Sequence, residues 1–239
     1  MQSHGLKATL VWLTLFCIAI GYLESSVVIY LRALYYPSGF AFPLSVMSEN
    51  IAFTEVVREI VTLIILLSIA HLAGHNQRQR FAWFLYCFAI WDIFYYVFLK
   101  LLINWPESLL TWDVLFLIPT TWTGPVIAPI IISLTMILLA GMMLFIEEKI
   151  PLFSISWLVR TIIIIGAGIV FLSFVLDYSL FMLKHCTFSG LLHSDVVQEA
   201  MRMYIPVHFN WWLFLAGLSV IFAGQLGVFF QAMKMIKRK

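Results

Sequence analysis

The sequence predicts an all-α membrane protein, a polytopic bundle of six transmembrane helices with interfacial or re-entrant segments on one side. The first observation behind this prediction is composition. Of 239 residues, 63% are hydrophobic and only 11% are charged, whereas soluble domains carry about 25% charged residues. The second is a mean hydropathy of +1.00. The third is a series of apolar runs, each about 20 residues long, which is the length that crosses a ~30 Å hydrocarbon core.

The predicted spans form a single transmembrane domain, 1–239, with no soluble domain and no long linker. A helix satisfies its own backbone hydrogen bonds, as the membrane interior requires. The expected boundaries are about 8–31, 52–73, 81–103, 126–146, 157–182 and 207–233.

The segment 104–125 joins the third and fourth predicted spans. Thr111 is a suitable cap for a short apolar turn over 112–118. Such a turn is too short to cross a membrane and too apolar for water. We therefore expect it to lie at the interface or to enter the membrane as a re-entrant element. Pro125 is expected at the first position of the helix that follows.

Orientation follows from the distribution of lysine and arginine. An even number of spans places both termini on the same side of the membrane. That side carries nine basic residues: Lys7, Arg78, Arg80, Lys149, Arg160, Lys234, Lys237, Arg238 and Lys239. The opposite side carries five: Arg32, Arg58, Lys100, Lys184 and Arg202. The sequence therefore predicts cytoplasmic termini, and the opposite side is called the outer side.

Asp92 stands in the middle of the third predicted span. A carboxylate at this depth is costly unless it faces protein, water or an opposite charge. Tyr96 and Lys100 follow at four-residue spacing and share its helix face. The Trp-Asp pair at 91–92 returns at 112–113, which makes Asp113 a second candidate.

Other charged residues are expected in the outer half of the first two spans. Glu55 and Glu59 lie four residues apart with Arg58 beside them. At about 1.5 Å per residue, Glu24, Arg58, Glu59 and Asp92 reach comparable depths, which predicts a charge network between the first three helices. Three interpretations remain open: ion pairs that fix helix packing, a path for protons or ions, or an enzyme site that uses acid/base chemistry or a hard metal ion.

Histidines supply two further candidate sites. His71 and His75 form an HxxxH pair, whose spacing places both imidazoles on one helix face and suits Zn²⁺ or haem. The alternative is that they lie at the lipid interface near a helix C-terminus. His208 is a candidate to join Asp113 or Glu55 at the outer mouth of the bundle. The alternative there is an interfacial aromatic belt, because tryptophans follow at 211–212.

Small residues recur in the fifth and sixth predicted spans, where they allow close helix approach within the chain or across to another subunit. They are Gly166, Ala167, Gly168, Ala216, Gly217, Ala223, Gly224 and Gly227.

Several signatures are absent from the sequence. It has no GxxxxGK[ST], GxGxxG, HExxH or GxSxG motif, which argues against a nucleotide-driven pump and the common hydrolases. A net charge of +2 gives no basic surface for nucleic acid. No particular cofactor is predicted.

The run WDIFYYVFLK (91–100) and the run WPESLLTWDVLFLIPTTWTGPV (105–126) together resemble a group of bacterial multi-pass membrane proteins with no established activity. The likeness covers the second to fourth spans, with the stretch TEVVREI (54–60) before them. The resemblance implies a bacterial origin, hence the cytoplasmic (inner) membrane, and a shared outer-half cluster. It implies no catalytic residue.

The sequence favours a non-enzymatic subunit or scaffold of a membrane assembly, because it lacks soluble domains and catalytic motifs and has glycine-rich final helices. The expected partners are the lipid bilayer and other membrane subunits or further copies of the chain. Two alternatives stay open. One is a proton or small-solute transporter or channel that uses the acidic cluster, and the other is an intramembrane enzyme acting on a lipid or quinone.

Overall fold

The computed structural model describes residues 3–150, 153–186 and 194–237. Within these ranges the chain forms seven helices and one two-stranded hairpin. The elements are α1 (Ser3–Tyr35), α2 (Glu49–Ala73), α3 (Gln77–Ile103), β1 (Trp112–Phe116), β2 (Trp122–Pro125), α4 (Ile127–Lys149), α5 (Trp157–His185), α6 (Ser194–Met201) and α7 (Trp211–Ile236). All the helices except α6 are long and apolar enough to cross a membrane, six in the described ranges. The predicted all-α multi-pass bundle is confirmed.

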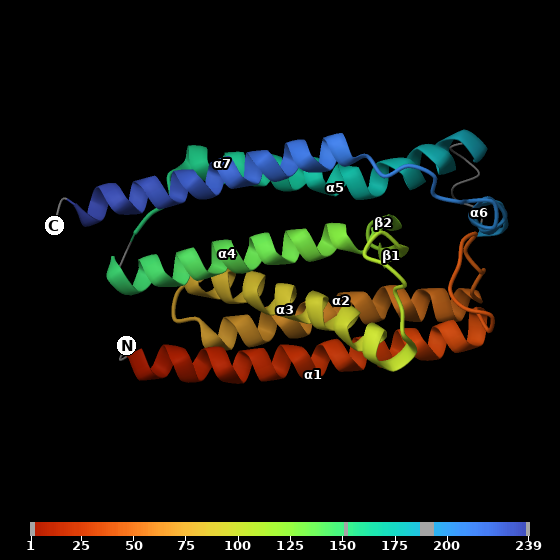
Figure 1. The fold of residues 1–239 in the computed structure, drawn as a ribbon, viewed down its shortest axis with the longest axis horizontal. Coiled ribbons are helices and arrows are strands. Elements are labelled where there is room, and N and C mark those ends of the chain that lie inside the picture. The colour runs from red at the N-terminus through yellow and green to blue at the C-terminus, as the bar shows by residue number, and fades with distance from the viewer. Residues whose placement is uncertain (1–2, 151–152, 187–193, 238–239) are drawn as a thin grey trace.

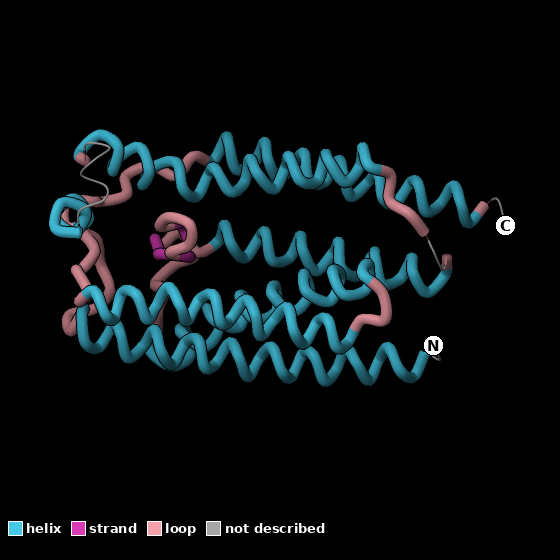
Figure 2. The backbone as a smooth tube through the Cα atoms, turned by 180° about the vertical axis from the view of Figure 1, so that it is seen from behind, coloured by secondary structure: helices cyan, strands magenta, loops and turns pink. Residues whose placement is uncertain are grey.

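The six long helices run along one common axis (Figure 1). Both chain termini lie at one end of the bundle, called here the terminal end. The hairpin, α6 and the 36–48 loop lie toward the other, called the hairpin end, and the view from behind shows the same arrangement (Figure 2). This placement agrees with an even number of spans.

The helices form two units. In the first, α1–α4, the central helix α3 contacts α1, α2 and α4. Its core is a cluster of buried side chains: Leu13, Cys17, Leu66, Ala70, Trp83, Cys87 and Trp91. In the second unit α5 packs along α7, and this pair lies on one side of α4 (Figure 1). The two units meet mainly where α5 contacts β2 and where α7 contacts α4.

Glycines allow the backbones of α5 and α7 to approach closely. A Cβ added to Gly166 would lie 2.9 Å from the carbonyl oxygen of Gly217, and one added to Gly217 would lie 2.9 Å from the carbonyl oxygen of Gly166. Gly224 and Gly227 face side chains of α5 in the same way, whereas Gly168 faces open space. The close approach expected from small residues therefore occurs within the chain.

The segment 112–118 contains a β-strand, so the predicted capped turn is wrong. β1 pairs antiparallel with β2, and Asp113 lies opposite Gly124. Aromatic and β-branched residues in both strands favour this conformation. Pro125 is the last residue of β2, and α4 begins only at Ile127. The expectation that Pro125 opens the helix is therefore also wrong.

The hairpin enters the bundle between the two units. Phe116 of β1 stacks on Phe88, in the middle of α3, with ring centroids 6.2 Å apart. Trp122 of β2 stacks on Phe174 of α5 with centroids 6.0 Å apart. Non-helical backbone is tolerated at membrane depth only where protein or water surrounds it. The depth of Phe116 along α3 fits the re-entrant alternative for this segment.

Candidate functional site

A buried ion pair joins α1 to the hairpin. Arg32 Nη2 donates to Asp113 Oδ1 at 3.1 Å, and the two side chains are only 10% and 2% exposed. The Arg32 guanidinium also lies over the Trp105 ring, 3.7 Å from its centroid, a cation–π contact. Burial raises the pKa of Asp113 to about 6, while the charge of Arg32 acts in the opposite direction. Arg32 is therefore the main reason that this buried carboxylate stays ionised near neutral pH.

A second ionic cluster joins α1 to α2. Arg58 Nε donates to Glu55 Oε2 at 2.8 Å, and Arg58 Nη1 pairs with Glu24 across the helix interface. Thr62 Oγ1 also donates to Glu24, at 3.3 Å. One guanidinium thus serves two carboxylates from different helices. Such an arrangement fixes which helix surfaces meet more than it adds to stability.

Glu59 binds the hairpin directly. The backbone N–H of Leu117 donates to both oxygens of the Glu59 carboxylate, at 3.1 and 3.0 Å. Leu117 directly follows β1, so this contact holds the tip of the hairpin against α2. It also satisfies a backbone donor that would be costly to leave unpaired inside a membrane.

Asp92 lies outside the network formed by Glu24 and Arg58. Its Oδ2 atom accepts a hydrogen bond from Ser133 Oγ at 2.8 Å. Because Ser133 belongs to α4, this bond ties α3 to α4, on the far side of α3 from the ionic cluster of α1 and α2. Similar depth along the bundle therefore does not bring Asp92 into that cluster.

The two residues expected on the same face as Asp92 have different partners. Tyr96 is buried, and its hydroxyl and that of Tyr95 lie near Asp113, where they lower the pKa of that carboxyl. Lys100 Nζ donates to the carbonyl oxygen of Pro106 at 2.9 Å, within the loop that follows α3. The three residues of the predicted common face thus have different direct partners: Ser133 for Asp92, Asp113 for Tyr96 and the Pro106 carbonyl oxygen for Lys100.

Among the described residues, His208 forms no ion pair with Asp113 or Glu55. It is exposed and lines a cavity of about 160 Å³ at the hairpin end, together with Asp177 and Thr123. The Tyr204 hydroxyl donates to Asp177 at 2.7 Å and lies 2.9 Å from Thr123 Oγ1. Tyr204 is 1% exposed, and burial raises its pKa.

Asp177 and Arg32 are site residues that the sequence analysis missed. Asp177 lies inside the fifth apolar run, so the criterion that selects Asp92, an acid within a span, would have selected it as well. Arg32 pairs with a residue 81 positions away in sequence. No short-range signal in the sequence indicates such a partner.

The histidine pair does not have the predicted geometry. His71 lies in the last turn of α2, but the helix ends at Ala73 and Gly74 is its C-cap. His75 follows that cap, so the two imidazoles do not share a helix face, and both residues are exposed. Within residues 3–150, 153–186 and 194–237, no group of three or more His, Cys, Asp or Glu side chains is placed to hold a metal ion.

The fold and the polar site together define a multi-pass membrane protein in which buried charges bind a two-stranded hairpin to two of the long helices. No protein-family model, curated protein or solved structure matches the chain. The resemblance of 91–126 to bacterial multi-pass proteins therefore stays a prediction.

Proposed function

We propose that the protein is a non-enzymatic subunit or scaffold of a membrane assembly. The proposal rests on one observation: the charged side chains of the outer half join elements of the chain to one another. Arg32, Asp113 and Glu59 bind the hairpin to α1 and α2, and Arg58 with Glu24 binds α1 to α2. Carboxylates that perform transport or catalysis must face a substrate or water path, whereas these are engaged in holding elements of the chain together.

The proposed setting is a bacterial inner membrane with both termini in the cytoplasm. The terminal end carries most of the basic residues, including Lys7, Arg78, Lys149, Arg160 and Lys234, and an excess of such residues marks the cytoplasmic side. Labelling of a Lys237→Cys variant with a membrane-impermeant maleimide tests this placement. The label should react in inside-out vesicles and not in spheroplasts, and the reverse result would contradict the orientation.

Isolation of the tagged chain from its native membrane tests the assembly. After crosslinking in the membrane and extraction in a mild detergent, we expect the chain to be recovered with another membrane protein or a second copy in a fixed ratio. Membranes with the untagged chain serve as the control. A well-behaved monomer with no crosslinked partner would contradict the proposal.

Two variants can then show which face the partner uses. A Cβ added to Gly141 of α4 or to Gly168 of α5 would meet nothing within 4 Å. Because both glycines face open space, we expect Gly141→Leu and Gly168→Leu to leave the fold of the monomer intact. Each should abolish crosslinking only if its own face is the interface, which distinguishes the two helices.

A second candidate, a transporter or channel for protons, is favoured by one specific observation. Glu59 and Asp92 have no Lys or Arg within 4 Å in the described part of the chain, unlike Glu24, Glu55 and Asp113. Intramembrane carboxylates often mark proton relays, and one without a neighbouring cation takes up a proton more readily. Proton uptake into proteoliposomes that falls in both Asp92→Asn and Glu59→Gln would support this candidate. Uptake equal to that of empty liposomes would exclude it.

A further inference from the structure

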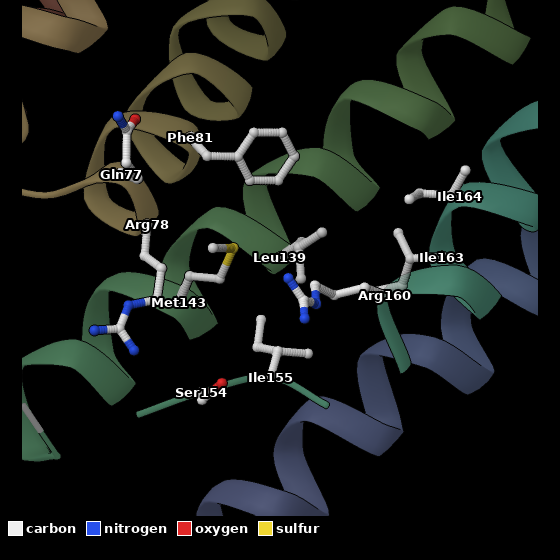
Figure 3. Close-up of a pocket in the computed structure, with 10 residues that line it drawn as sticks. All are labelled: Gln77, Arg78, Phe81, Leu139, Met143, Ser154, Ile155, Arg160, Ile163 and Ile164. Carbon is white, nitrogen blue, oxygen red and sulfur yellow. The ribbon is translucent and has the colours of Figure 1, made fainter. Parts of the chain in front are cut away.

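A cavity of about 470 Å³ opens at the terminal end between the two helical units. Its volume falls within the roughly 300–1,000 Å³ of small-molecule sites. Figure 3 shows the Arg160 side chain extending from α5 toward Leu139 of α4, with Phe81 of α3 on one side of the space and Ile164 on another. The wall is mostly apolar: Phe81, Leu139, Met143, Ile155, Ile163 and Ile164.

The cavity also contains two arginines, of which one has no acidic partner among the described residues. Arg78 Nε lies 3.3 Å from Glu147 Oε2, so its charge is largely compensated. Arg160 has no Asp or Glu oxygen within 4 Å among the residues that the structure describes. A guanidinium without an acidic partner attracts an anion, and its planar array of N–H donors matches the oxygens of a phosphate group.

The depths of the charged and apolar lining residues differ. Arg78 and Arg160 lie in the first turns of α3 and α5, hence near the level of lipid headgroups. Ile164 lies four residues beyond Arg160, roughly 6 Å deeper along α5. The site is therefore cationic at headgroup level and apolar at the level of acyl chains.

We propose that this cavity binds one anionic phospholipid from the leaflet at the terminal end. Its phosphate contacts Arg160, and an acyl chain lies between α4 and α5. A free phosphate ion would satisfy the arginines but leave the apolar wall uncovered. The bound lipid would fill the space that lies between the two helical units at the terminal end. The inference does not depend on the proposed role as a subunit.

Native mass spectrometry of the full-length protein tests the site, with phosphatidylglycerol and phosphatidylcholine as the two lipid probes. The wild type should retain one phosphatidylglycerol about tenfold more tightly than phosphatidylcholine. Both lipids offer a phosphate to Arg160, but the choline of phosphatidylcholine also brings a positive charge near the guanidinium, which weakens binding. Arg160→Gln should remove this preference. Lys237→Gln, which removes a charge from the same end of the bundle but outside the cavity, should retain it.

A second variant tests the apolar part of the site. Ile164 is 69% exposed, so Ile164→Trp narrows the cavity without disturbing the core and should weaken phosphatidylglycerol binding with Arg160 intact. Equal binding of the two lipids, or wild-type binding in both Arg160→Gln and Ile164→Trp, would overturn the proposal. Complete displacement of the lipid by millimolar inorganic phosphate would also overturn it, because the site would then be one for free anions.

Discussion

The two helical units are held together by different physical means. In α1–α4, buried charges fix a non-helical hairpin: Arg32 with Asp113, and Glu59 with the N–H of Leu117. In the α5–α7 unit, Gly166 and Gly217 let two helix backbones come into contact. A Cβ added to either glycine would lie only 2.9 Å from the carbonyl oxygen of the other. The first arrangement depends on complementary charges and the second on the absence of side-chain atoms.

This difference reflects what each element requires inside a membrane. The strands and loop of the hairpin leave backbone groups and a carboxylate that need partners from other helices. Two complete helices have no such requirement, so van der Waals contact between small residues is sufficient. The two units should therefore respond to different mutations.

The largest expected effect is the loss of Arg32. Arg32→Gln leaves Asp113 buried without its cation, which should lower the free energy of unfolding by about 3–5 kcal/mol at neutral pH. Replacing both residues in Arg32→Leu/Asp113→Leu should recover most of this loss, because no isolated charge remains. Tryptophan fluorescence during unfolding in detergent measures both. A double variant no more stable than the single one would show that the pair matters for more than charge compensation.

A smaller effect is expected in the other unit from a single methyl group. Gly166→Ala places a Cβ 2.8 Å from the backbone nitrogen of Ile221 and should destabilise the protein by about 1–3 kcal/mol. Gly168→Ala, two residues away on the same helix but facing open space, should be neutral or stabilising by up to about 1 kcal/mol. Equal effects of the two substitutions would contradict backbone contact between α5 and α7.

The smallest expected effect is a pH dependence confined to the charged unit. The pKa of Asp113 is about 6 in the folded protein, above the value of about 3.9 in an unfolded chain. Protonation of Asp113 thus favours the folded state. Its contribution to the free energy of unfolding is fully present below about pH 4 and is lost as the pH rises through 6. Without Arg32 the pKa of Asp113 should rise further. For each unit of this rise, the free energy of unfolding of Arg32→Gln should recover by about 1.4 kcal/mol when the pH is lowered.

Unfolding of the wild type, Arg32→Gln and Asp113→Asn across pH 5–8 measures this dependence. The loss of unfolding free energy in Arg32→Gln, relative to the wild type, should become smaller toward pH 5. Asp113→Asn cannot ionise at this position and should lack this pH dependence. A deficit of Arg32→Gln that is constant across this range would show that Asp113 is not the group responsible.

The sequence was sufficient to predict the spans. Runs of about 20 apolar residues determine where a helix can cross a membrane, and the fourth and fifth predicted spans begin within a residue of α4 and α5. It did not predict the hairpin. The strand Trp112–Phe116 is short and mostly apolar, so its periodicity does not distinguish a strand from a buried turn.

The polar site was predicted by residue type but not by partner. Burial cost alone selects Glu24, Glu59 and Asp92, because any charge within a span is exceptional. Which groups meet depends on the rotation of each helix about its axis. For Asp92, that rotation directs the carboxylate to Ser133 of α4 instead of the neighbouring α1 and α2.

Hydrogen–deuterium exchange of the hairpin tests most directly whether the outer-half charges hold this element in place. We expect the amides of 112–125 to exchange slowly in the wild type and much faster in Arg32→Gln and in Glu59→Ala, which lacks the acceptor for Leu117. The amides of α5 and α7 should keep their protection in both variants. Hairpin exchange that is unchanged in both variants would contradict the account, because the charges would then not be what fixes the hairpin.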